Sequence, residues 1–316
     1  MFSESTRIVV TGANGFIGSA LVSALRSKYP VLAVSRVLPG LSSHEALLSD
    51  FLSASSSDKI RKFAPTHLVH CAAAAHKKYP NTNLEYDRLR RANIQLPVDL
   101  ASVSLRLGLK RFVFLSSVGV HGSYTPPGVL LNESSQFFPV NPYSASKLAA
   151  ELEIRRLLKD TACEFSIIRP ALVYGRGMPG NLRALVKAID LGLPFPLASI
   201  KNRRSFISIE NLVSAIEAVT LHPSAPDEAY LAADEEWISS ANLIRCAARA
   251  RNRPALLLPL SPGLMRSLAQ LPLVGRTVGQ LVDDLVVDST KLRQQLGWRQ
   301  PSPQAIALQE AFARGL

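Results

Sequence analysis

A strand, a glycine-rich turn and a helix follow one another near the start of the chain, and this succession constrains the fold more than any other feature. Residues 7–11 form a short apolar run typical of a buried strand, and residues 18–27 have the apolar spacing of a helix. Three glycines in the turn between them permit a tight bend, close approach of the backbone to a pyrophosphate, and close packing of helix on strand. The helix N-terminus adds free N–H groups for the anion. The turn therefore predicts a dinucleotide site at Gly12, Asn14, Gly15, Phe16, Ile17 and Gly18.

Short apolar runs continue to alternate with helical segments as far as Gly175. Strands are predicted at residues 31–34, 68–73, 111–115 and 165–169, and helices at 84–107, with a break near Pro97, and at 143–158. This alternation is typical of βαβ units and predicts an α/β fold, with a doubly wound parallel sheet covered by helices on both faces. Beyond Gly175, glycines and prolines interrupt the pattern, although residues 204–218 again predict a strand and a helix.

Composition excludes several classes of protein. The apolar content of 47% can fill a substantial core, which argues against disorder. The longest apolar stretches, such as residues 254–265, are well below the roughly 18 residues of a membrane span, and the first residues lack the pattern of a secretory signal. Cys71, Cys163 and Cys246 show no metal-ligand spacing and cannot all pair. We therefore expect a cytoplasmic protein without a metal site.

The positive charge of the chain is concentrated in one region. The net charge is +12, and residues 59–111 contain eleven Lys or Arg against three Asp or Glu, so that +8 lies in one sixth of the chain. Solvated helix faces are the explanation that we favour, and an anionic membrane surface or an acidic partner enzyme is the alternative. No zinc-finger spacing, RNP-like motif or basic zipper accompanies the charge. A nucleic-acid partner is therefore not expected.

The end of the second predicted strand bears on the choice of dinucleotide. In such domains an acidic residue at this position accepts a hydrogen bond from the ribose 2′-hydroxyl of NAD, whereas a nearby Arg accommodates the 2′-phosphate of NADP. Here Val34 is followed by Ser35 and Arg36, a small hydroxyl and a guanidinium that suit a phosphate. The sequence therefore favours NADP(H), with NAD(H) as the alternative and an exposed strand-end Arg as the structural explanation.

Tyr143 and Lys147 lie four residues apart at the start of a predicted helix, and so on one face of it. A tyrosine is a poor acid or base at neutral pH, but a neighbouring ammonium and an oxidised nicotinamide both favour its phenolate. A buried strand ends upstream in Ser116 and Ser117, at the sheet edge where ligands bind. Ser117 can therefore hydrogen-bond the carbonyl or alcohol on which Tyr143 acts.

Taken together, these motifs resemble an extended short-chain dehydrogenase/reductase over essentially the whole chain. The motifs that carry the resemblance are TGANGFIG at residues 11–18, Ser117, YSASK at 143–147, RPALVYG at 169–175 and RSFISIENL at 204–212. The resemblance implies a Rossmann domain, residues 1–174 with 204–228, interleaved with a smaller C-terminal domain, residues 175–203 with 229–316, that binds a nucleotide sugar. It also implies a homodimer.

The resemblance assigns further residues. It makes Ser117, Tyr143 and Lys147 the catalytic triad. It places near the cofactor Asp50 and Phe51 at the adenine, Ala72, Ala73, Asn93 and Ser116 along the dinucleotide, and Arg169 and Pro170 on the nicotinamide side.

Sugar 4,6-dehydratases share this scaffold but follow the catalytic hydroxyl with an Asp-Glu pair. Here Val118 and Gly119 follow Ser117, and neither can serve as acid or base, so dehydration of that type is disfavoured. Where the epimerase-like pattern ends in Val-Tyr-Gly, this chain has His121. His121 is predicted either to hydrogen-bond the substrate or to pack the loop.

The tail at residues 285–298, with the segments 70–76 and 111–122, looks most like the UDP-N-acetylquinovosamine dehydrogenase group. This resemblance implies NADPH-dependent reduction of a UDP-4-keto-6-deoxy-hexosamine for surface polysaccharide, with UDP-hexose or UDP-N-acetylhexosamine 4-epimerisation and tightly bound NAD as the alternative. A non-catalytic, dinucleotide-binding subunit is disfavoured because both Tyr143 and Lys147 are present. Expected contacts of the UDP-sugar are Val118, His121, Asn181, Arg204, Arg276 and, with the weakest support, Arg183.

Overall fold

A seven-stranded parallel sheet forms the larger part of the molecule in the computed structural model, which describes residues 6–36, 45–53, 58–75, 82–261, 263, 267 and 275–313. The strands are β1 (Ile8–Thr11), β2 (Val31–Ser35), β3 (Glu45–Leu47), β4 (His67–His70), β5 (Arg111–Leu115), β6 (Glu164–Pro170) and β9 (Ala229–Ala232). Their spatial order is β3-β2-β1-β4-β5-β6-β9, and every pairing is parallel. The strand order reverses direction at β1 and β4, which places a ligand crevice at the carboxyl ends of these two strands. The doubly wound sheet is therefore confirmed.

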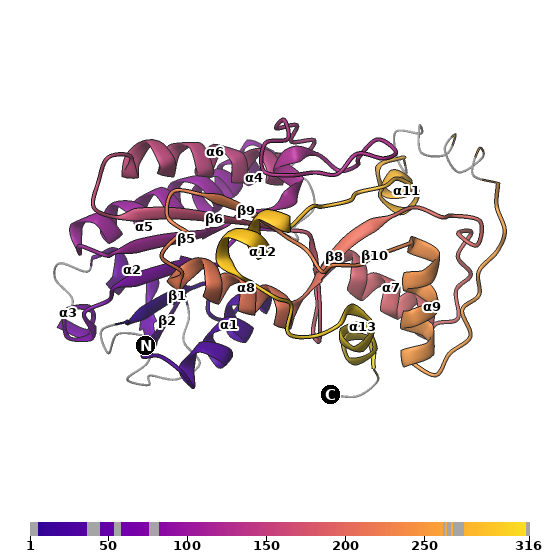
Figure 1. Cartoon of the computed structure of the whole chain (residues 1–316), viewed down its shortest axis with the longest axis horizontal. Coiled ribbons are helices and arrows are strands. Elements are labelled where there is room, and N and C mark those ends of the chain that lie inside the picture. The colour runs from indigo at the N-terminus through magenta and orange to yellow at the C-terminus, as the bar shows by residue number, and fades with distance from the viewer. Residues whose placement is uncertain are drawn as a thin grey trace.

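Helices cover both faces of this sheet (Figure 1). One face packs against α1 (Phe16–Arg26), α8 (Ile209–Leu221) and α12 (Thr290–Leu296) through a buried apolar core. The other face packs against α2 (Leu48–Leu52), α3 (Asp58–Phe63), α5 (Leu96–Arg106) and α6 (Pro142–Leu158). The strands contribute fully buried runs of Val, Ile, Leu and Phe, as expected for a parallel sheet without a solvent-exposed face.

The helix that was expected to break near Pro97 is instead a continuous helical run. It comprises α4 (Asn83–Arg90), a π-helical turn η2 (Arg91–Gln95) and α5. Pro97 stands at the start of α5, where it has no N–H to offer the carbonyl four residues earlier. The irregularity therefore precedes the proline, in the π-turn that carries Asn93.

A smaller lobe lies beside the carboxyl edge of the large sheet (Figure 1, right). It contains the three-stranded sheet β10-β8-β7, formed by β7 (Leu172–Tyr174), β8 (Arg204–Ser208) and β10 (Trp237–Ile238). Its helices are α7 (Gly180–Asp190), α9 (Ser240–Ala250), α11 (Gly275–Val282) and α13 (Gln304–Phe312). A separate apolar cluster, which includes Leu182, Leu243, Ile244 and Phe312, forms its core.

The chain is interleaved between the two parts, but sheet pairing divides it differently from the expected boundaries. β9 follows residue 228 and yet pairs with β6 in the large sheet, and α12 packs on the same part. β8, expected with the Rossmann domain, pairs with β7 and β10 in the small sheet. The differences arise because strand pairing is decided by tertiary contacts that the local pattern does not encode.

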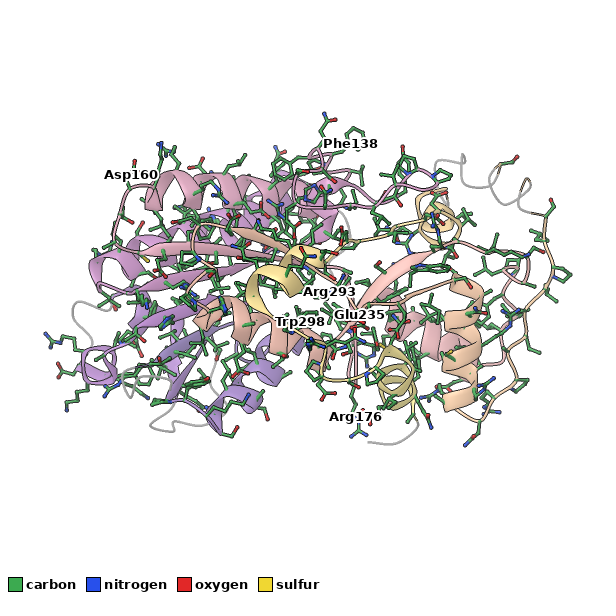
Figure 2. The ribbon with its side chains drawn as sticks, in the orientation of Figure 1. Phe138, Asp160, Arg176, Glu235, Arg293 and Trp298 are labelled. Atoms are coloured by element: carbon green, nitrogen blue, oxygen red, sulfur yellow. The ribbon has the colours of Figure 1, made fainter. Side chains whose placement is uncertain are left out.

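Buried hydrogen bonds join the two parts. The Asp234 carboxylate accepts hydrogen bonds from Tyr174 Oη and Asn211 Nδ2, both at 2.7 Å, and from the Ser208 backbone N–H. Within the larger part, Trp298, which Figure 2 shows in the middle of the molecule, donates its indole N–H to Ser214 Oγ of α8 at 3.2 Å. The position of the lobe relative to the large sheet is therefore set by polar as well as apolar contacts.

One residue of the basic block 59–111 belongs to the interior. Arg111 is 1% exposed, forms an ion pair of 2.7 Å with Glu164, and donates to carbonyls at the end of α8. This charge caps a helix and is not part of a surface patch. Of the helices that the structure describes, none combines the length and the apolar character needed to cross a membrane.

Candidate active site

The glycine-rich turn is built by close contacts that exclude side chains. Gly12 has φ +75°, and a Cβ on it would lie 2.6 Å from the backbone nitrogen of Ala72, just beyond β4. A Cβ on Gly18 would lie 2.2 Å from the Gly12 carbonyl oxygen. α1 begins at Phe16, two residues earlier than predicted, and its N-cap Gly15 makes no side-chain capping bond. The turn is thus a backbone cradle at a helix N-terminus, and it fits the phosphates of a dinucleotide.

The residues on either side of this turn lie where a dinucleotide would extend. Asn14 Nδ2 donates a hydrogen bond of 3.1 Å to Ser35 Oγ at the end of β2, and Arg36 is exposed next to it. Ile17 packs on the core beneath the sheet, whereas Phe16 packs against the core of the smaller lobe. The predicted phosphate and ribose residues are therefore brought together, and their contacts with a cofactor stay a prediction.

The two residues expected at the adenine both lie on α2. One has a fully buried side chain and the other a half-buried one. Phe51 is fully buried among apolar residues of the sheet face. Asp50 lies in the first turn of α2 and is half-buried. Any contact of Phe51 with an adenine would have to involve its backbone.

Asn93 connects the loop after β4 to α6. It is 1% exposed, its Oδ1 accepts from the Ala74 backbone N–H at 2.7 Å, and its Nδ2 donates to Ser146 Oγ at 2.9 Å. Ser146 Oγ donates in turn to the Tyr143 carbonyl at 2.7 Å. Asn93 therefore holds the loop of Ala72 and Ala73 against α6, a role that its predicted position along the cofactor did not reveal.

The start of α6 is fixed by its own sequence and by its contact with the loop after β5. Asn141 caps the helix by accepting from the Ser144 N–H at 2.8 Å, and Pro142 occupies the first turn. The short helix η3 (Val118–His121) has Ser117 as its N-cap. A Cβ on Gly119 would lie 2.6 Å from Ser144 Oγ and 3.3 Å from Ser117 Oγ. Gly119 thus lets Ser117 approach the helical turn that carries Tyr143.

Lys147 lies one turn further along α6 in a buried site. It is 1% exposed, and its Nζ is 4.0 Å from the centroid of the Phe114 ring. Burial lowers the pKa of Lys147 to about 7, against the opposing effect of Glu151. Burial also raises the pKa of Tyr143 to about 12. In this structure the phenol is therefore protonated and able to donate a proton.

At the carboxyl ends of β4 and β5, two buried polar atoms have no hydrogen-bond partner within the part of the chain that the structure describes. These are His70 Nε2 and Ser116 Oγ. The His70 ring stacks on Phe114 at 5.9 Å and its Nδ1 is 2.7 Å from Thr11 Oγ1. Burial, and then the Lys147 charge, lowers the pKa of His70 to about 3, so that the ring is neutral. An unpartnered hydroxyl at the carboxyl end of β5 can bond to a ligand, which fits the dinucleotide predicted to contact Ser116.

Arg169 has protein partners at all three of its nitrogens. Its guanidinium pairs with the Glu151 carboxylate at 3.0 and 2.6 Å, and its third nitrogen donates to His121 Nε2 at 3.0 Å. Both members of the ion pair are almost fully buried. The Arg169 side chain, expected on the nicotinamide side, therefore forms its hydrogen bonds within a buried protein network. Pro170 is buried at the end of β6 and pairs with Ala232. Glu151 was missed by the sequence analysis, although it continues the four-residue spacing of Tyr143 and Lys147.

The substrate candidates of the smaller lobe gather around α11 and the segment after it. Arg204 Nη1 donates to the Asp283 carbonyl at 3.1 Å, and burial lowers the pKa of Arg204 to about 10. Asn181 Nδ2 contacts Gln280 Oε1 at 3.4 Å, and Arg183 is exposed. The side chain of Arg276 lies outside the described residues. Val118 is 5% exposed and packs in an apolar cluster, so its side chain is structural here.

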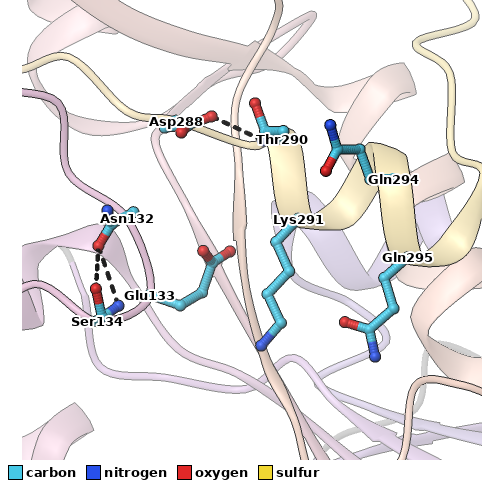
Figure 3. A pocket seen from close by; sticks show the side chains of 8 residues that line it. All are labelled: Asn132, Glu133, Ser134, Asp288, Thr290, Lys291, Gln294 and Gln295. Atoms are coloured by element: carbon cyan, nitrogen blue, oxygen red, sulfur yellow. Dashed lines mark hydrogen bonds between the residues drawn. The ribbon is translucent and has the colours of Figure 1, made fainter.

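A surface depression lies apart from these residues, between the loop at residues 132–134 and α12 (Figure 3). Its lining is polar and comprises Asn132, Glu133, Ser134, Asp288, Thr290, Lys291, Gln294 and Gln295. Glu133 accepts from the Leu231 N–H at 2.8 Å, which anchors the loop to β9. The depression contains none of the predicted catalytic residues. No group of three or more metal-ligating side chains occurs among the described residues.

Comparison with known proteins agrees with this architecture. The NAD dependent epimerase/dehydratase family matches residues 8–233. A UDP-glucose 4-epimerase of Vibrio cholerae is 33% identical over 308 residues, which cover 96% of this chain and 93% of the relative. The solved structure of MoeE5 with UDP-glucose and NAD has a TM-score of 0.75 at 21% identity and covers 97% of both chains. The human epimerase family protein SDR39U1 with NADPH has a TM-score of 0.76 at 19% identity, covering 97% of this chain and 99% of that one.

These matches confirm the resemblance predicted from the motifs: the chain is an enzyme of the NAD-dependent epimerase/dehydratase family, within the extended short-chain dehydrogenases/reductases.

Proposed function

We propose that this enzyme reduces the C4 ketone of a UDP-4-keto-6-deoxy-hexosamine with NADPH. The observation that carries the proposal is the close approach of the Ser117 loop, through Gly119, to the turn of α6 that begins with Tyr143, with Lys147 buried one turn further along. The Ser117 hydroxyl, the helix that carries both Tyr143 and Lys147, and the backbone cradle come from three separate parts of the chain. Their meeting point is where this fold binds ligands.

The residues present account for the proton chemistry of such a reduction. A bound nicotinamide would supply hydride to the C4 carbon. Ser117 hydrogen-bonds the ketone oxygen, and Tyr143 donates a proton to that oxygen as it becomes a hydroxyl. The raised pKa of Tyr143, about 12, keeps the proton on the phenol until it is needed. The Lys147 ammonium then favours the phenolate that remains.

The residues at the end of β2 support NADPH as the cofactor, and with it a net reduction. Ser35 and Arg36 stand there, and Arg36 is exposed and able to meet a 2′-phosphate. A net reductase exchanges its cofactor at each turnover, which suits NADPH. Val118 and Gly119 argue further against dehydration because one is buried in an apolar cluster and the other is packed against Ser144.

A UDP moiety is proposed to lie between the large sheet and the smaller lobe. Arg204 is the leading candidate for its diphosphate because its guanidinium lies at the start of β8, facing the segment after α11. The MoeE5 relative was solved with UDP-glucose. Asn181 approaches the same helix and is proposed to contact the sugar or uridine.

A second candidate function is 4-epimerisation of a UDP-hexose or UDP-N-acetylhexosamine. The observation that favours it is the UDP-glucose 4-epimerase relative, at 33% identity over nearly the whole chain. The same triad would serve, but Tyr143 would first accept a proton and later return it. NAD would then remain bound and no net cofactor would be consumed.

The experiment that separates the two functions incubates the enzyme with a UDP-4-keto-6-deoxy-hexosamine and NADPH. Reduction predicts stoichiometric loss of the NADPH absorbance and one reduced sugar. Interconversion of UDP-glucose and UDP-galactose without loss of cofactor would establish the epimerase instead. An Arg36→Ser variant is expected to bind NADPH more weakly while its NADH affinity changes little, and equal losses for both cofactors would contradict the assignment of Arg36.

We also propose a homodimer formed through α4 and α6. These helices contact each other and expose Leu84 (59%), Tyr86 (50%) and Leu152 (56%), an unusual set of apolar side chains for a free helix face. Sedimentation should report a dimer for the parent and a weaker association for a Leu84→Ser/Leu152→Ser variant. We also propose that the reaction takes place in the cytoplasm, whose reducing conditions are compatible with the three free cysteines.

A further inference from the structure

His121 stands at the centre of a buried hydrogen-bond network. The network links four segments at the carboxyl end of the large sheet: η3, β6, α6 and the segment that precedes α6. His121 is the last residue of η3, the short helix whose N-cap is Ser117. Its Nε2 is 3.0 Å from Arg169 Nη1 at the end of β6, and Arg169 pairs with Glu151 on α6. Its Nδ1 is 3.3 Å from the Gln136 carbonyl, in the segment that leads into α6. The imidazole is 5% exposed.

The partners of the two ring nitrogens fix the protonation state of His121. A guanidinium can only donate, so Nε2 must accept, and a carbonyl can only accept, so Nδ1 must carry the proton. The ring is therefore the neutral Nδ1–H tautomer. A second proton on Nε2 would place two donors against each other and break the link to Arg169.

We infer that His121 is a positioning residue: in its neutral form it holds the loop of Ser117 against the helix that carries Tyr143 and Lys147, through Arg169 and Glu151. The inference rests on the proposed function, because it concerns the geometry of that same triad. Both ring nitrogens have protein partners. Of the two roles predicted from the sequence, the inference therefore favours packing of the loop over a hydrogen bond to the substrate.

The surroundings of His121 reinforce the neutral form. Arg169 of β6 and Glu151 of α6 are the charged groups that face it, and the segment before α6 presents the Ser135 and Gln136 carbonyls and the Phe137 ring. Burial, and then the Arg169 charge, lowers the pKa of His121 below its usual 6.5, against the weaker effects of Glu151 and the carbonyls. The Phe137 ring also lies 5.0 Å from the Arg169 guanidinium carbon. The link is thus complete at neutral pH and is lost in acid.

Two substitutions separate positioning from simple packing. His121→Gln keeps an acceptor for Arg169 and a donor for the Gln136 carbonyl but cannot titrate. His121→Leu keeps the bulk and removes both hydrogen bonds. His222→Gln is the matched control, because His222 ends α8 and its Nδ1 accepts from the Ser224 N–H, away from the triad.

The first measurement needs neither substrate nor cofactor. Nitrogen NMR of the ligand-free protein should show the Nδ1–H tautomer for the signal that disappears in His121→Gln, with protonation only below pH 6.5. Hydrogen exchange should be faster in η3 and the first turns of α6 in His121→Leu but not in His121→Gln. An Nε2–H tautomer, or unchanged exchange in His121→Leu, would overturn the inference even if the proposed reaction is correct.

The second measurement is the pH profile of turnover. His121→Leu should lose turnover roughly tenfold at neutral pH, the size expected for a lost hydrogen bond to a charged group, with cofactor affinity preserved. His121→Gln should retain most turnover and lack the decline below pH 6.5 that the parent and His222→Gln show. Identical acid declines in parent and His121→Gln would contradict the inference. If the NMR and exchange results hold but no UDP-sugar is turned over, the proposed function is what has failed.

Discussion

The glycine turn and the proposed catalytic edge, formed by Ser117 and by α6 with Tyr143 and Lys147, lie at the same end of the sheet but are built by opposite means. In the turn, Gly12 and Gly18 act by having no side chain, since a Cβ on either would be 2.6 Å or less from a backbone atom. At the catalytic edge, Lys147 and the Glu151–Arg169 pair act through side chains that are buried together with their charges. The turn depends on backbone sterics within one short segment, whereas the edge depends on electrostatic partners that come from distant segments.

The largest effect is expected at the group that exchanges the proton. Tyr143→Phe should reduce turnover roughly one hundred- to ten thousand-fold, the range for loss of a general acid. Cofactor binding at the glycine turn should persist, which a fluorescence titration with NADPH can measure. Tyr124→Phe, which removes the hydroxyl of a tyrosine that is 53% exposed, is the control and should be fully active. Near-normal turnover of Tyr143→Phe would show that another group supplies the proton.

The second effect concerns buried charge on α6. Glu151→Gln leaves the Arg169 guanidinium buried without its carboxylate, so the free energy of unfolding should fall by about 3–5 kcal/mol. Glu153→Gln makes the same change two residues further on, in a pair with Arg156 whose side chains are 51% and 84% exposed. That loss should be about 0–1 kcal/mol. Urea unfolding of both variants measures the contrast, and equal losses would mean that burial does not distinguish the two pairs.

The third effect is expected in the turn. Gly12→Ala and Gly108→Ala introduce the same methyl group at similar backbone angles, φ +75° and φ +65°, but only Gly12 has a neighbour within reach. Gly108→Ala should therefore cost only the strain of a left-handed residue, about 1–2 kcal/mol of unfolding free energy. Gly12→Ala should cost more and weaken dinucleotide binding at least tenfold, because the loop at Ala72 must move. If both variants bind NADPH equally well, the close contact does not shape the cradle.

The smallest effect is the pH dependence of stability that Lys147 imposes. Its pKa is lowered from 10.5 unfolded to about 7 folded, so above pH 7 the unfolded chain binds more protons than the folded one. The free energy of unfolding should therefore rise as pH increases through this window, by about 1 kcal/mol between about pH 7 and about pH 8. Lys147→Met should lack this increment. Chemical unfolding of parent and variant at the two pH values gives the comparison, and parallel changes would indicate that Lys147 is not the group responsible.

The parts of the fold that the sequence predicted well are those with local causes. The turn at Gly12–Gly18, the strands β1, β2, β4, β5 and β6 of the large sheet and the start of α6 each carry their signal within a few residues, through β-branched runs, glycine spacing and capping by Asn141. The strands β3 and β9 were not predicted. The helix after β4 was predicted less well. Its break near Pro97 is absent because Pro97 lies in the first turn of α5, where a missing N–H is tolerated, and the irregularity is instead the π-turn at Arg91–Gln95.

The local sequence pattern did not predict the contacts between different strands and helices. Arg169 was expected beside the nicotinamide and His121 beside the substrate or in the loop, and the structure joins them instead through Glu151. β9 was assigned to the smaller lobe and pairs in the large sheet. In each case the partner lies on another strand or helix, at a distance in sequence that local periodicity does not cover.

The sequence by itself determined the doubly wound sheet and the glycine turn, because each follows from short-range sterics within a few residues. The triad of Ser117, Tyr143 and Lys147 is predicted from the family resemblance. Only the tertiary structure decided which charges are buried together. Whether a guanidinium meets a ligand or a carboxylate depends on what packs around it, since a buried charge must find a partner and the nearest one is set by the packing of strands and helices. For Arg169 that partner is Glu151, and His121 completes the network.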